Sequence, residues 1–69
     1  MGGIVFSQFD RVAITTDDFE DLGVPRGAIC FILDLYTSDE FELDYQEEGT
    51  GATILTFSAR SDQIRSLDK

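Results

Sequence analysis

The sequence contains no histidine and a single cysteine. Without histidine, hydrolysis through a Ser-His-Asp or Cys-His arrangement is excluded. A zinc site of the Cys/His type is excluded for the same reason. One cysteine cannot form the intrachain disulfides on which small secreted domains usually depend. We therefore expect a cytoplasmic protein that is not an enzyme and holds no cofactor or metal.

Basic residues are scarce as well, with five Lys and Arg against fourteen Asp and Glu, and the formal net charge is −9. Nucleic-acid affinity comes mainly from basic side chains that displace counterions, and anionic membranes attract basic segments in the same way. This charge therefore argues against both partners. It favours a basic protein partner, because opposite electrostatic fields steer encounter. The alternative is that the charge only keeps a small protein soluble.

Long hydrophobic runs are absent too, and no stretch approaches the roughly 20 apolar residues of a membrane-spanning helix. The hydrophobic content is nevertheless 42%, with six Phe and two Tyr, which argues against a disordered chain. At 69 residues we expect one small domain. We assign residues 9–69 to this domain and residues 1–8 to an N-terminal extension.

Short runs of β-branched and aromatic residues alternate with closely spaced turn signals, which is typical of a small all-β barrel or sandwich. A helical bundle is disfavoured because no stretch repeats apolar residues at helical spacing over two turns. We expect a single turn capped by Ser61, after which Ile64 and Leu67 return to the core in a short last strand. The other expected strands are residues 9–15, 28–36, 41–45 and 53–58.

The run 28–36 is almost continuously apolar, so we expect a strand that is central in the sheet or buried on both faces. Cys30 within this run has no basic neighbour in sequence, which indicates a buried and unreactive thiol. Asp34 is the only acid in the run. It either faces solvent or pairs with an arginine such as Arg11 or Arg60.

An acidic loop is expected at residues 16–26, with Phe19 as an apolar side chain among carboxylates. Asp17, Asp18, Glu20 and Asp21 offer oxygens that calcium prefers, but the EF-hand spacing of glycine and glutamate is missing. A solvated acidic loop is therefore favoured over a metal site.

Residues 24–32 (VPRGAICFI) resemble the glycine turn and second strand of SH3-like barrels, including the KOW type. With FDRVA before them and FELDY, LTF and DQIRSL after them, their order is similar to a small bacterial family known as domain of unknown function 4926. The resemblance covers roughly residues 9–67. It implies an all-β, five-stranded SH3-like barrel with a short 3-10 turn near the C-terminus, and no catalytic residues. KOW domains that bind nucleic acid carry Lys and Arg where this chain has mostly acids.

The most informative feature is an acidic band at residues 39–48. Residues 41–45 alternate between apolar and acidic side chains, so Glu42 and Asp44 share one face of a strand. A negative stripe on a rigid sheet would suit a basic partner, and aromatic residues are enriched as anchors in interfaces. The alternative is an ordinary solvated face that discourages edge pairing. The predicted partner-binding residues are Asp39, Glu40, Glu42, Asp44, Glu47 and Glu48, with Tyr45 and Phe19, and also Tyr36, as aromatic anchors.

These observations favour a non-enzymatic protein-binding module. Its most concrete form is an acidic inhibitor of the immunity or antitoxin type, which covers the positive cleft of a nuclease-like protein and mimics the charge of nucleic acid. The alternative is a structural or assembly subunit, which forms a homodimer or packs into a larger complex through an apolar face of the strand at 28–36.

Overall fold

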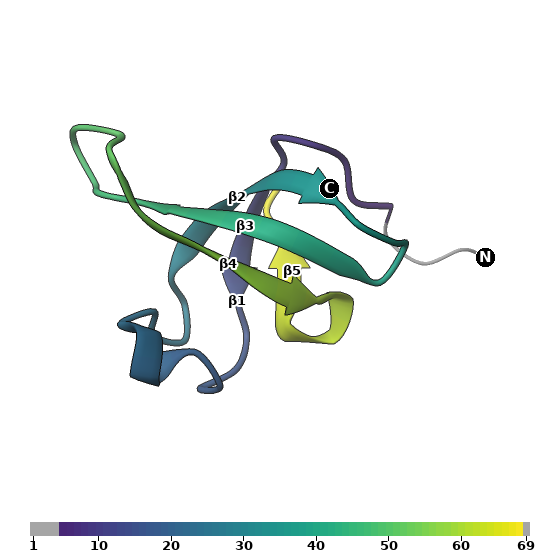
Figure 1. The fold of residues 1–69 in the computed structure, drawn as a ribbon, viewed down its shortest axis with the longest axis horizontal. Coiled ribbons are helices and arrows are strands. Elements are labelled where there is room, and N and C mark those ends of the chain that lie inside the picture. Colours follow the sequence, from purple (N-terminus) through teal and green to yellow (C-terminus); the bar gives the residue numbers. More distant parts are fainter. Residues whose placement is uncertain (1–4, 69) are drawn as a thin grey trace.

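The computed structural model describes residues 5–68 and places five antiparallel strands in one sheet (Figure 1). The order across the sheet is β4-β3-β2-β1-β5. Two 3-10 turns, η1 and η2, lie in the β1–β2 loop and just before β5. The elements are β1 Arg11–Ile14, η1 Glu20–Leu22, β2 Ile29–Leu35, β3 Glu40–Gln46, β4 Thr53–Arg60, η2 Ser61–Gln63 and β5 Ile64–Ser66.

This architecture confirms the predicted fold class, an all-β domain of five antiparallel strands with a 3-10 turn before the last strand. The last strand pairs with the first, so β1 lies between β2 and β5. The first strand begins two residues later than expected. Phe9 has a φ of 71°, which is outside the extended region and therefore cannot continue a strand.

The core lies on one face of the sheet. Strand β2 is central, as predicted, but it is not buried on both faces: Cys30 and Ile32 are completely buried, whereas Ile29 between the loop and Cys30 is half exposed. Phe6, from the segment expected to be an extension, packs its ring against Phe41 at a centroid distance of 5.1 Å. The buried cluster consists of Val12, Ile14, Phe19, Val24, Cys30, Ile32, Phe41, Leu43, Phe57, Ala59 and Ile64.

The β1–β2 loop is fixed to the core by its apolar side chains. Phe19 is only 8% exposed, and its ring lies 4.8 Å from that of Phe57. The prediction that Phe19 anchors a partner is therefore wrong, since a lone apolar side chain in an acidic loop is stabilised by burial against the sheet. Arg26 closes the loop by donating to both carboxylate oxygens of Asp17 at 3.1 and 3.0 Å and to the carbonyl of Thr15 at 3.0 Å.

The turn η2 links the acidic loop to the end of the sheet. The buried side chain of Gln63 accepts a hydrogen bond from the Arg60 amide at 2.8 Å and donates one to Asp18 at 3.0 Å. Ser61 is the first residue of the turn and not its cap, and its hydroxyl donates to the Asp39 carboxylate. The turn thus ties together three connections between strands.

Within residues 5–68, no helix is long and apolar enough to cross a membrane.

Candidate protein-binding surface

The acidic residues of the predicted band at residues 39–48 differ in their exposure to solvent. Asp39, Glu40, Glu47 and Glu48 are exposed, and Glu42 is half buried. Asp44, by contrast, is only 5% exposed.

The prediction of one continuous exposed stripe is therefore wrong at Asp44. Its neighbours across the sheet are Phe31 on β2 and Thr56 on β4, and Gln46 donates to its Oδ2 at 2.7 Å. Strand alternation correctly assigns Asp44 to the face opposite the core, but the large side chains beside it on that face remove it from solvent. Tyr45 lies on the other face and is partly buried against the core.

Asp34, Tyr36 and Glu42 lie together on the outer face, and we name them the acidic cluster; Asp34 and Tyr36 are exposed and Glu42 is half buried. Asp34 on β2 lies directly opposite Glu42 on β3. The hydroxyl of Tyr36 donates to Oε1 of Glu42 at 2.8 Å, and Ser58 on β4 donates to the same oxygen at 3.4 Å. Like charges directly opposite each other across two strands are in general destabilising.

The pKa of the Tyr36 phenol reflects this local negative charge. The hydrogen bond to Glu42 raises the pKa of the phenol above its usual value, and partial burial and the charges of Glu42 and Asp34 act in the same direction. Tyr36 is 57% exposed despite this hydrogen bond. The cluster therefore presents an aromatic side chain and two carboxylates to solvent together.

The arginines within residues 5–68 that form ion pairs lie elsewhere. Arg11 contacts Asp68 at 3.1 Å and Arg60 contacts Asp62 at 3.2 Å, while Arg26 contacts Asp17 as described above. The expectation that Asp34 pairs with Arg11 or Arg60 is wrong, and the other expectation, that Asp34 faces solvent, is confirmed. In the described part of the chain, no ion pair neutralises the acidic cluster.

The β3–β4 hairpin extends past the start of β2 (Figure 1). Residues of this hairpin and of the start of β2 line a groove. Its volume is about 840 Å³. Apolar side chains on its wall come from the two strands that flank β3: Ile29 and Phe31 belong to β2, and Ile54 belongs to β4. Glu47 and Glu48, in the hairpin loop, are also lining residues of the groove. We call this hollow the hairpin groove.

The other candidate residues that the sequence suggests have structural roles or lie apart from the acidic cluster. Cys30 is completely buried, and burial raises the pKa of its thiol to about 12, with the nearby charge of Asp44 as a smaller cause. Glu20 and Asp21 are exposed on η1, at a distance from the acidic cluster along the chain and across the fold. Within residues 5–68, no three potential ligands gather closely enough to hold a metal ion.

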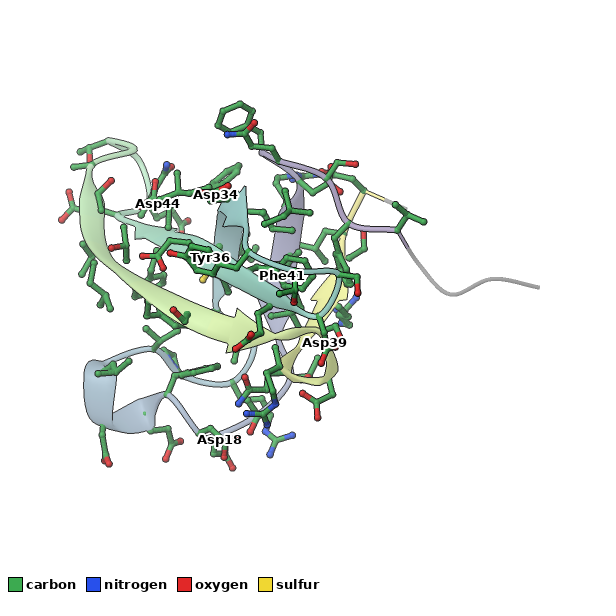
Figure 2. The ribbon with its side chains drawn as sticks, turned by 45° about the vertical axis from the view of Figure 1, so that its right-hand side comes forward. Asp18, Asp34, Tyr36, Asp39, Phe41 and Asp44 are labelled. Atoms are coloured by element: carbon green, nitrogen blue, oxygen red, sulfur yellow. The ribbon has the colours of Figure 1, made fainter. Side chains whose placement is uncertain are left out.

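Figure 2 shows the consequence of this arrangement: Asp34, Tyr36 and Asp44 lie along the same part of the sheet, whereas Asp18 lies apart from them, in the acidic loop. The sequence pattern predicts Tyr36 as an anchor but does not indicate that Asp34 belongs to the partner-binding surface. The missing information was the register, because an irregularity at Leu33 places Asp34 opposite Glu42. Nothing in the spacing of the apolar residues indicates this bulge.

Comparisons with protein-family models, with curated protein sequences and with solved structures find no significant match to this chain. The resemblance to a small bacterial family of unknown function therefore stays a prediction.

Proposed function

We propose that this chain is a non-enzymatic protein-binding module, and that the acidic cluster on the outer face of β2 and β3 docks a basic partner protein. The observation that carries the proposal is the direct opposition of Asp34 and Glu42 without a neutralising arginine from the described chain. A sheet that only needed solubility could place these charges anywhere on its exposed surface. Here they occupy opposite positions on β2 and β3 beside an exposed aromatic ring.

A partner's Lys or Arg between the two carboxylates would replace their repulsion by two attractive contacts. Tyr36 adds a face on which a cation can rest and an aromatic surface of the kind that dominates binding energy in interfaces. The net charge of −9 acts at longer range, because it raises the rate at which a positively charged protein encounters the module. Short-range and long-range charge thus favour the same class of partner.

An inhibitor of a nucleic-acid-binding protein is the most concrete form of this proposal. The cleft of such a protein is positive because it attracts phosphates. A compact domain with exposed carboxylates can occupy that cleft in place of nucleic acid and block it. This form predicts that partner binding and nucleic-acid binding are mutually exclusive.

The proposal is tested with a pair of double variants that change the net charge equally. Asp34→Asn with Glu42→Gln removes the acidic cluster, whereas Glu20→Gln with Asp21→Asn removes two exposed carboxylates from η1. Each variant and the unchanged chain are used to capture partners from a lysate of the source cells, and the captured protein is identified and its affinity measured. We expect the first variant to lose the basic partner and the second to retain it. Equal retention by both variants would refute the acidic cluster as the docking surface.

A second candidate function is that of an assembly subunit, and the edge strand β4 favours it. Between Thr53 and Arg60 this strand carries no charged residue, and Ile54 is 53% exposed. Uncharged edge strands favour pairing with another strand. Light scattering distinguishes the candidates: a dimer that persists at low and high salt supports the subunit, and a monomer supports the binding module.

A further inference from the structure

We propose that the hairpin groove receives a single arginine side chain of the partner protein and seats its guanidinium against the carboxylate of Asp44. This inference rests on the proposed function for the basic nature of the partner. It assigns to the groove, which lies beside the acidic cluster, the recognition of one particular side chain.

The buried carboxylate of Asp44 is the first observation. Oδ2 accepts a hydrogen bond from Gln46, but Oδ1 is buried and accepts none from the described residues. A carboxylate can accept about four hydrogen bonds, and buried polar atoms in folded proteins nearly always have a partner. Asp44 therefore has acceptor capacity that the described chain does not use.

The position of Asp44 relative to the groove is the second observation. Phe31, which lies directly opposite Asp44 on β2, and Gln46, which donates to it, are both lining residues of the groove. Asp44 is not itself a lining residue of the groove, but these two direct neighbours of its carboxylate are. Gln46 is partly exposed, so the proposal requires its amide to rotate away from Oδ2 and give the partner's side chain access to the carboxylate.

The wall of the groove suits the rest of an arginine side chain. Ile29 and Ile54 are 51% and 53% exposed and can cover the aliphatic part of the side chain, and Phe31 offers a ring on which a guanidinium can stack. Glu47 and Glu48 add negative charge to the lining. Apolar walls, this negative charge and a buried acceptor together match a long side chain with a terminal cation.

Arginine fits this site better than the other basic occupant. Its guanidinium presents paired donors in a plane, which can satisfy Oδ1 and replace the Gln46 amide at Oδ2, whereas lysine is a compact charge without a planar face. A second copy of this chain is disfavoured as the occupant because each copy carries a net charge of −9. The groove is therefore assigned to an arginine of a different, basic protein.

The test uses two small probes with the unmodified chain, N-acetyl-arginine-N-methylamide and its uncharged isostere N-acetyl-citrulline-N-methylamide. Amide chemical shifts are followed by NMR as each probe is added. We expect saturable shifts at Phe31, Gln46 and Ile54 with the arginine probe only. Shifts of equal size with citrulline, or no saturable shift at these residues, would overturn the proposal. Equally tight binding of the corresponding lysine probe would overturn the assignment to a guanidinium.

Two variants locate the site. Asp44→Asn keeps the shape of the side chain and removes its charge, and we expect it to abolish the saturable shifts. Ile54→Ser changes a half-exposed wall residue and is expected to weaken the arginine probe about fivefold even if Asp44→Asn does not fold. Unchanged affinity in a folded Asp44→Asn protein, or in Ile54→Ser, would contradict the proposal.

The acidic cluster provides the control that separates this inference from the proposed function. The variant with Asp34→Asn and Glu42→Gln leaves the groove intact, so it should bind the arginine probe as the unmodified chain does. If the probe fails to bind but this double variant still loses the basic partner, the groove is refuted and the proposed function stands. If the probe binds and the partner is retained, the proposed function fails and the groove stands.

Discussion

Asp34 on β2 and Glu42 on β3 lie directly opposite each other on the outer face of the sheet, two carboxylates without an ion-pair partner in the described chain. The pair exists because the register shifts at Leu33, between Ile32 and Asp34. Such an arrangement is in general unfavourable, and a cation between the two side chains would reverse the sign of its contribution.

Neutralising one member of this pair should stabilise the free protein. We expect Asp34→Asn to raise the free energy of unfolding by about 0.2–1 kcal/mol, because cross-strand repulsion disappears while the amide oxygen can still accept the short hydrogen bond from the Leu35 amide. Urea unfolding at low salt measures the change. Asp21→Asn, at an exposed site on η1, is the control and should change stability less. An Asp34→Asn protein that is less stable than the unmodified chain would contradict the account.

The packing of Phe19 predicts a large stability effect from a loop residue. We expect Phe19→Ala to cost about 3–5 kcal/mol, because it removes a buried ring and its contact with Phe57. In a domain of this size such a loss approaches the whole stability. Phe9→Ala, at a ring that is 67% exposed, should change stability by less than about 0.5 kcal/mol. Thermal unfolding followed by circular dichroism measures both, and similar effects for the two variants would show that the loop does not pack as described.

The ion pair at the base of the acidic loop predicts a local pH dependence. The hydrogen bonds from Arg26, followed by its charge, lower the pKa of Asp17. A carboxyl whose pKa is lower in the folded state stabilises that state above the unfolded pKa, and this contribution disappears as the pH falls through the folded pKa. We expect Arg26→Gln to raise the pKa of Asp17 towards its ordinary value, as measured by NMR titration of the carboxyl carbon. Arg11→Gln, which breaks the contact with Asp68 instead, should leave Asp17 unchanged.

The burial of Cys30 predicts a protected thiol. Because the side chain is completely buried and its pKa is raised to about 12, the reactive thiolate forms only when the surrounding core opens. We expect a thiol reagent at pH 8 to label the folded protein at least about 100-fold more slowly than the protein in urea. Labelling at equal rates in the two conditions would contradict the burial of this residue.

The sequence predicts the strands and their faces well, because local periodicity depends on which residues alternate between core and solvent. Residues 41–45 show this clearly, with Phe41 and Leu43 in the core as expected. Burial on the outer face follows different rules. Asp44 is covered by side chains from β2 and β4, which only the register across three strands brings to it.

Two other differences have the same origin. Asp34 joins the acidic cluster because of a bulge, and Phe19 turns into the core because its loop folds back over the sheet, where it meets Phe57. Each depends on contacts between residues distant in sequence, which spacing and composition do not encode. The sequence places the predicted binding surface along β3 alone, whereas the surface that we propose is centred on the β2–β3 pair.

The proposed docking surface is tested most directly by isothermal titration calorimetry, which measures the affinity of the basic partner for the two charge-matched double variants. The account predicts that Asp34→Asn with Glu42→Gln weakens binding by at least about tenfold, or 1.4 kcal/mol, while Glu20→Gln with Asp21→Asn weakens it much less. Equal weakening by the two variants would show that only the net charge of the chain matters, and would contradict a specific docking surface at Asp34 and Glu42.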